Sequence, residues 1–134
     1  MDNNNFGNII LDHIGIAVND LDEGEIFWKL LGLTNVDDDF TIEEQGVMTR
    51  FYCTDSNEEG APKIELLKSL YDESPIAKFI QKRGVGIQQV CFRVENLDAM
   101  IAHLLDNGIQ MVDEVAKIGA RNTKIAFVHP NSTG

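Results

Sequence analysis

The sequence has few basic residues, few cysteines and no long apolar segment. It contains 11 Lys and Arg against 22 Asp and Glu, and its net charge of −11 argues against nucleic acid or an anionic membrane as the main partner. No apolar run approaches the roughly 20 residues that cross a bilayer, and the polar start MDNNNFGN is unlike a signal peptide. The two cysteines, Cys53 and Cys91, each lie in an apolar segment, so we expect buried reduced thiols and a cytoplasmic protein.

The amount of apolar sequence sets the number of domains that we expect. With 134 residues and 43% hydrophobic content, the chain can bury one substantial core but hardly two. We therefore predict a single domain over residues 1–134.

The chain contains nearly the same segment twice, at residues 11–36 and 87–112. The offset is a constant 76 residues, as from Val18 to Val94, and it places His13 on Gln89. The other matched pairs are Leu21 with Leu97, Asp22 with Asp98, Gly32 with Gly108, Val36 with Val112 and Phe51 with Phe127. The repeat is too long and has too few copies for a solenoid, so it predicts two copies of one supersecondary unit.

The hydrophobic pattern predicts the elements of each copy. Residues 9–18 and 86–94 alternate as strands, with His13, Gln89 and Cys91 on the face opposite the apolar one. Residues 20–31 and 96–107 have the caps of helices, and further strands are expected at 33–36, 46–53, 63–67, 109–115 and 123–129. The first helix has an apolar stripe that should pack on the core, formed by Ile26, Phe27, Leu30 and Leu31.

These elements predict an α+β fold of two βαβββ units. The units span about residues 9–67 and 86–134, and a helix at 74–84, capped by Ser74 and Pro75, joins them. Paired units of this kind resemble the vicinal oxygen chelate (glyoxalase/bleomycin resistance/dioxygenase) superfamily. Within it, the segments LDHIGIAV, SPIAKFIQKRG and KIAFVHPNSTG resemble the methylmalonyl-CoA epimerase family, from about residue 10 to the end of the chain. The resemblance implies a glyoxalase-like fold, with a curved mixed sheet around a metal and substrate cleft.

Polar residues on equivalent strands indicate a metal site. His13, Glu65 and Gln89 each lie opposite a helix-packing face, so two curved units would bring them together in one cleft. In the family these positions bind a divalent cation such as Co, Mn, Ni or Zn, which implies the same role here. Gln88 and Gln89 stand where the family usually has a His pair, and a neutral amide is a weaker ligand than imidazole.

The catalytic bases are less clear than the ligands. The family's fourth ligand, a Glu on a last strand that also serves as a base, would fall beyond Gly134, and we expect that strand to be missing from this chain. An unpaired strand edge would then favour a homodimer. The family's other base corresponds to Thr49, which cannot act as a carboxylate, and Glu43 and Glu44 are more simply a solvated acidic face. We therefore assign no catalytic residue.

The resemblance implies an isomerase that forms an enolate with metal assistance and epimerises the α-carbon of an acyl-CoA thioester. Gln88, Lys117, Arg121 and Lys124 are the predicted substrate-binding residues, because basic groups would hold the coenzyme A phosphates. Ordinary solvated patches remain an alternative for the basic residues. Two other functions stay open, a non-catalytic or vestigial ligand-binding module and another member such as a glyoxalase-like lyase or a dioxygenase.

Overall fold

The computed structural model describes residues 6–55, 58 and 60–134, apart from the side chain of Arg121. These residues form two compact units, of which the larger is Leu11–Phe92 and the smaller joins the described residues up to Ile10 with Arg93–Gly134. The predicted single domain over residues 1–134 stays a prediction.

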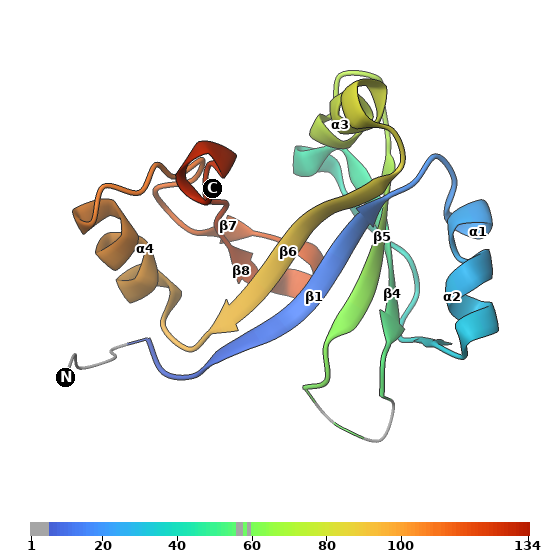
Figure 1. Ribbon diagram of the computed structural model, residues 1–134, viewed down its shortest axis with the longest axis horizontal. Helices are drawn as coiled ribbons and strands as arrows, with labels where there is room; N and C mark the ends of the chain where they lie inside the picture. Colours follow the sequence, from blue (N-terminus) through green and yellow to red (C-terminus); the bar gives the residue numbers. More distant parts are fainter. Residues whose placement is uncertain (1–5, 56–57, 59) are drawn as a thin grey trace. The chain divides into compact units, whose positions relative to one another are not determined.

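An open, curved mixed sheet forms the framework of the larger unit (Figure 1). Its strand order is β2-β4-β5-β1-β6, with β3 paired to β4. The strands are β1 (Ile9–Ala17), β2 (Thr34–Asn35), β3 (Phe40–Ile42), β4 (Val47–Cys53), β5 (Lys63–Ser69) and β6 (Gly86–Val94). β1 runs parallel to β5, and β4 runs antiparallel to β5. The predicted α+β class and mixed sheet are confirmed, whereas β3 was not predicted.

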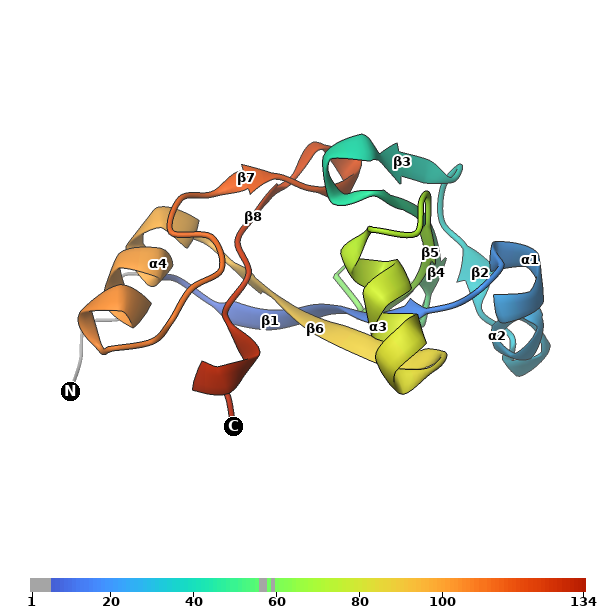
Figure 2. The same cartoon turned by 90° about the horizontal axis from the view of Figure 1, so that it is seen from above.

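The sheet has an apolar cluster on each face. Ile16, Tyr52 and Leu66 lie on one face, where Leu21 and the partly buried Trp28 of the helices α1 (Leu21–Gly24) and α2 (Ile26–Leu31) cover them. Residues of the opposite parity occupy the other face, where Ala17, Val47 and Leu67 pack against Ile76 of α3 (Pro75–Arg83). Figure 2 shows α3 and the α1–α2 pair on opposite sides of β4 and β5.

The segment predicted as one helix over residues 20–31 is two short helices. Asp20 caps the first as expected, since its carboxylate accepts from the backbone N–H of Glu23 at 2.9 Å. Gly24 ends that helix against β1, where an added Cβ would lie 2.8 Å from Cγ1 of Val18. The chain restarts at Ile26, and this change of direction turns Trp28 toward the core. The predicted apolar stripe is therefore wrong, because all four of its residues are exposed, namely Ile26, Phe27, Leu30 and Leu31.

The helix α3 begins and ends where the sequence predicts. Ser74 Oγ accepts from the backbone N–H of Ala77 at 3.1 Å, and Pro75 occupies the first turn, where its missing N–H costs nothing. The same hydroxyl lies 2.7 Å from Oγ of Ser69, so the cap also ties the helix to the end of β5. Gly84 ends the helix.

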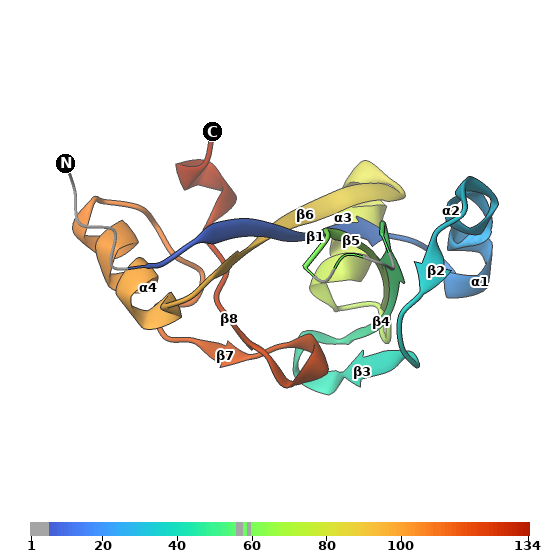
Figure 3. The same ribbon diagram turned by 90° about the horizontal axis from the view of Figure 1, so that it is seen from below.

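The smaller unit contains the helix α4 (Leu97–Asp106) and the strand pair β7 (Lys117–Ile118) and β8 (Lys124–Ile125), shown in Figure 3. Asn96 caps α4 as predicted. The predicted strand at 109–115 is replaced by an isolated bridge between Met111 and Val128, and that at 123–129 shortens to β8. The backbone N–H of Phe127 donates to the Asp113 carboxylate at 2.7 Å. A side chain therefore accepts a hydrogen bond that a neighbouring strand would accept in a regular sheet.

Among the described helices, none is long and apolar enough to cross a membrane.

Candidate metal centre

The structure brings together the three residues predicted as metal ligands. In the register of β1 and β5, Gly15 lies opposite Glu65, so the side chains of His13 and Glu65 emerge on the same face. Nε2 of His13 is 3.3 Å from Oε1 of Glu65, and the Gln89 amide donates to the same oxygen at 3.1 Å. Glu65 is buried, with 3% of its surface exposed. Because no comparison tests their role, assignment of the three as metal ligands stays a prediction.

Gly15 makes this convergence possible. A Cβ at this position would lie 2.5 Å from Cγ of Gln89 and 3.0 Å from Cδ1 of Leu67. Gln89 comes from β6, the neighbour of β1 on the side away from β5, and its side chain must cross β1 to reach Glu65. A glycine leaves room for this crossing, since no other residue lacks a Cβ.

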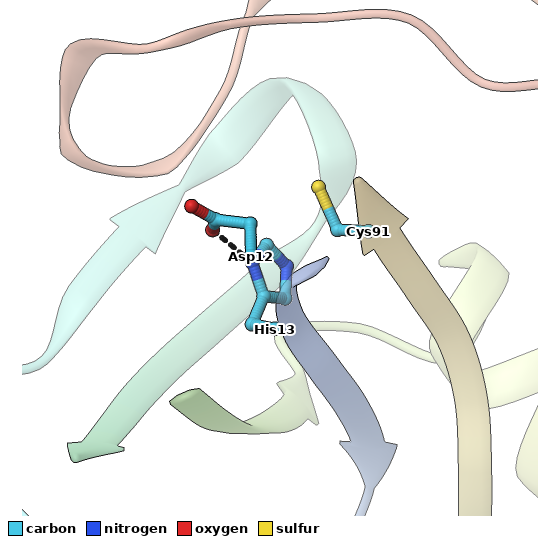
Figure 4. Close-up of side chains that lie close together, drawn as sticks. All are labelled: Asp12, His13 and Cys91. Carbon is cyan, nitrogen blue, oxygen red and sulfur yellow. Dashed lines mark hydrogen bonds and ion pairs between the residues drawn. The ribbon is translucent and has the colours of Figure 1, made fainter. Parts of the chain in front are cut away.

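Two further side chains complete the cluster (Figure 4). The Asp12 carboxylate lies 2.6 Å from Nδ1 of His13. A ligand atom of Cys91, on β6, lies within 4.8 Å of ligand atoms of both Asp12 and His13. Strand alternation assigns Asp12 to the other face of β1, which is why sequence reasoning missed it. Cys91 shares the face of Gln89 in the sequence pattern, but its apolar surroundings led to its interpretation as a core thiol.

The electrostatics of the cluster favour a positive charge at its centre. Burial lowers the pKa of His13, but hydrogen bonds to Asp12, Cys91 and Glu65, together with the charge of Glu65, outweigh burial and raise that pKa to about 11. No lysine or arginine contributes to this shift. With this raised pKa, the His13 imidazolium supplies the positive charge between the carboxylates of Asp12 and Glu65.

The donor set fits a divalent cation. Asp12 accepts at Nδ1 of His13, which is the second-shell arrangement that fixes the tautomer and aims Nε2 at a metal. Nε2 faces the buried carboxylate of Glu65, and imidazole with carboxylate suits zinc, cobalt, nickel or manganese. His13 and Glu65 would hold such an ion, and its positive charge would offset the buried carboxylate.

Buried polar atoms without hydrogen-bond partners lie in the same unit. Among the described residues these are Nε2 of Gln45, Oγ1 of Thr49 and Oε1 of Gln88. Thr49 is fully buried and shares the face of Phe51, whose ring packs edge-on against His13 at 5.4 Å. Gln88 and Gln89 thus differ in their hydrogen bonding. The amide of Gln89 donates to Glu65, whereas the side-chain oxygen of Gln88 has no hydrogen-bond partner among the described residues. A substrate-binding role for Gln88 stays a prediction.

The predicted phosphate-binding residues belong to the smaller unit. Lys117 already pairs with Asp113, at 3.1 Å, and lies over the ring of Phe127, at 5.1 Å from its centroid. Lys124 is exposed, and the side chain of Arg121 lies outside the described part of the structure. Their role toward coenzyme A stays a prediction.

Comparison with known proteins identifies the family. The family described as Glyoxalase/Bleomycin resistance protein/Dioxygenase superfamily matches residues 12–127. The mitochondrial methylmalonyl-CoA epimerase of Bos taurus is 34% identical, over 92% of this chain and 69% of that protein. The crystal structure of methylmalonyl-CoA epimerase from Mycobacterium tuberculosis has a TM-score of 0.83 and 40% identity, over 91% of this chain and 79% of that one.

A ligand complex is also among the similar structures. A variant of the Streptomyces coelicolor methylmalonyl-CoA epimerase in complex with 2-nitronate-propionyl-CoA has a TM-score of 0.84 and 29% identity, over 95% of this chain and 88% of that one. The predicted resemblance to the epimerases is confirmed, and the chain belongs to the glyoxalase/bleomycin resistance/dioxygenase superfamily.

Proposed function

We propose that this protein is an acyl-CoA epimerase that exchanges the proton on the α-carbon of methylmalonyl-CoA or a close analogue. The observation that carries the proposal is the meeting of His13, Glu65 and Gln89 on one buried strand face. The epimerase relatives support it, as does the acyl-CoA analogue named in the Streptomyces coelicolor structure.

The residues of the cluster divide the work between them. His13 and Glu65 would hold the cation, Asp12 bonds to Nδ1 of the imidazole, and Gln89 donates to the carboxylate of Glu65. When bound, a cobalt, manganese, nickel or zinc ion would supply Lewis acidity toward the thioester carbonyl, which makes the α-proton easier to remove.

Proton transfer needs a group on each side of the α-carbon. Thr49 has a neutral hydroxyl and cannot serve as a carboxylate base. Glu43 and Glu44 are exposed on a 3-10 turn. The described cluster itself offers the carboxylates of Asp12 and Glu65 and the thiol of Cys91. Because Glu65 faces the cation position, Asp12 holds the imidazole and Cys91 lies beside it, we assign no proton carrier among the described residues.

The test is α-proton exchange, followed by NMR in D₂O with methylmalonyl-CoA and added Co²⁺. The unmutated protein should exchange the proton, and His13→Ala should slow the exchange by about 10²-fold or more. His103→Ala is the matched control, because His103 is exposed on α4 and should leave the rate unchanged. Absence of exchange by the unmutated protein would overturn the proposal.

A non-catalytic acyl-CoA-binding protein is the second candidate function. The observation in its favour is Thr49, which is fully buried at the position of a family base and carries no charge. Calorimetry and the exchange measurement together separate the two functions. A binding module would bind methylmalonyl-CoA in the calorimeter and would not exchange its α-proton.

We propose that Lys117, Arg121 and Lys124 hold the phosphates of the coenzyme A moiety. Three basic residues within eight positions would offset the net charge of −11 near a polyanionic substrate. Reversing the charge of Lys117 and Arg121 together should weaken acyl-CoA binding, and more so at low salt than at high salt. Unchanged affinity in dilute buffer would remove this patch from the binding site.

A homodimer and a cytoplasmic location complete the proposal. The exposed apolar side chains of α2, among them Leu30 with 82% of its surface exposed, favour a protein partner over solvent. The free thiols of Cys53 and Cys91 favour a reducing compartment. Light scattering after size exclusion tests the first statement, and cell fractionation tests the second.

A further inference from the structure

We propose that Cys91 is a ligand of the metal ion, so that this chain builds a thiolate-containing site. The inference rests on the proposed function, since it concerns the ion that the epimerase would use. It places the sulfur in the coordination sphere beside His13, and it leaves Gln89 as a hydrogen-bonding partner of Glu65.

The geometry places the sulfur at the cluster. Cys91 follows Gln89 by two residues on β6, so both side chains leave the strand on the same face. The sulfur lies within 4.8 Å of ligand atoms of His13 and Asp12 (Figure 4). A zinc ion sits about 2.3 Å from a thiolate and about 2.0 Å from an imidazole nitrogen, so a sulfur and a nitrogen that share one ion lie within about 4.3 Å of each other. A small rotation of the Cys91 side chain brings the sulfur into this range.

The neighbouring amide is already engaged. The Gln89 NH₂ group donates to Glu65, so this end of the side chain points at the carboxylate. A thiolate is a stronger donor toward zinc or cobalt than a neutral amide. Sγ of Cys91 contacts the carbonyl oxygen of Phe92 at 4.0 Å, a long distance, and it also bonds to His13, so the sulfur already faces the imidazole. When the sulfur binds, its proton is released to the solvent.

The other cysteine gives a built-in control. Cys53 ends β4, where it pairs with Thr34 of β2 and Lys63 of β5. It is a free, half-buried thiol like Cys91, but it does not belong to the cluster of Asp12, His13 and Cys91. Replacing either residue by serine makes the same chemical change. A difference in metal binding between the two variants therefore indicates that one of the cysteines coordinates the ion.

The experiment is a Co²⁺ titration of the full chain, followed by absorption spectroscopy. The unmutated protein and Cys53→Ser should both show an intense near-ultraviolet thiolate-to-cobalt charge-transfer band, and Cys91→Ser should lose it. Competition with a chelator should show Zn²⁺ affinity reduced by more than about tenfold in Cys91→Ser, because second-shell partners alone are worth about 10–100-fold. Cys91→Asp should recover affinity without the band.

A second measurement uses only the unmutated protein, so its result does not depend on whether the variants fold. Zn²⁺ should slow alkylation of Cys91 by iodoacetamide and leave that of Cys53 unchanged, as read by mass spectrometry. A charge-transfer band that persists in Cys91→Ser, Co²⁺ binding without such a band, or alkylation of Cys91 that ignores Zn²⁺ would each overturn the proposal. Proton exchange measured on the same samples judges the epimerase function separately.

Discussion

Two charged clusters lie on opposite faces of the same sheet, and they balance their charges in different ways. Arg50 stands beside Phe51 on β4, opposite Leu66, and its side chain enters the face covered by α1 and α2. It binds Asp39 with two parallel bonds, of 2.8 and 2.9 Å, and reaches Asp22 at 2.9 Å. A permanent cation therefore stands at the centre of this cluster.

The His13 cluster has no such cation. Its centre is an imidazole between the carboxylates of Asp12 and Glu65, with the thiol of Cys91 nearby. Only a proton or a bound ion can supply the positive charge that the Arg50 guanidinium supplies on the other face. The Arg50 cluster is therefore complete within the fold, whereas the charge balance of the His13 cluster depends on a proton or a bound ion.

The largest effect should follow from breaking the complete cluster. Arg50→Met leaves the Asp39 carboxylate without its cation and leaves Glu25 with Lys29 as its cation. We expect a loss of about 2–3 kcal/mol in the free energy of unfolding, below the full value for a buried pair because Asp39 is partly exposed. Urea denaturation measures this, with the exposed Lys82→Met as control. Equal stability of the two variants would contradict a structural role for Arg50.

The next largest effect concerns the packing of Gly15 against Gln89 in the His13 cluster. Gly15→Ala should cost about 1–2 kcal/mol, because its Cβ would overlap the side chain of Gln89. The double variant with Gln89→Ala removes that overlap and should recover part of the lost stability. Strictly additive losses in this double-mutant cycle would show that Gly15 does not make room for Gln89.

Strand faces and helix starts could be predicted from the sequence, because they depend on local periodicity and capping residues. Alternation along the strands assigned His13, Gln89 and Cys91 to one face, and capping patterns predicted the helices that begin after Ser74 and Asn96. Such features are set by neighbours a few residues away, which a linear pattern records.

Features that depend on distant partners were missed. Arg50 meets residues 11 and 28 positions away, and nothing in the segment MTRFY indicates those partners. Asp12 was missed because its carboxylate turns back to the ring of His13, against the alternation of the strand. The break in the helix after Asp20 was also missed, because the periodic pattern does not record the close approach of Gly24 to Val18.

The free energy of unfolding at acidic pH should reveal the contribution of the Arg50–Asp39 pair. The bonds from Arg50 hold the pKa of Asp39 below its ordinary value of 3.8. A lowered folded-state pKa adds stability that is present above pH 3.8 and is lost as the pH falls through the folded value. The stability difference between the unmutated protein and Asp39→Asn should therefore shrink on acidification below this pH. A difference independent of pH, measured by urea denaturation across this range, would contradict the pairing.

The smallest effect on stability should come from the site itself. Glu65→Gln keeps the shape of the side chain and an oxygen that can accept from Gln89, and it removes a buried negative charge. The relief of desolvation offsets the lost attraction to His13, so the free energy of unfolding without metal should change by less than about 1 kcal/mol. Divalent-ion affinity should nevertheless fall, because a neutral amide replaces a carboxylate ligand. A variant that unfolds as readily as Arg50→Met would mean that Glu65 serves the fold, and that the two faces of β4 and β5 do not differ as proposed.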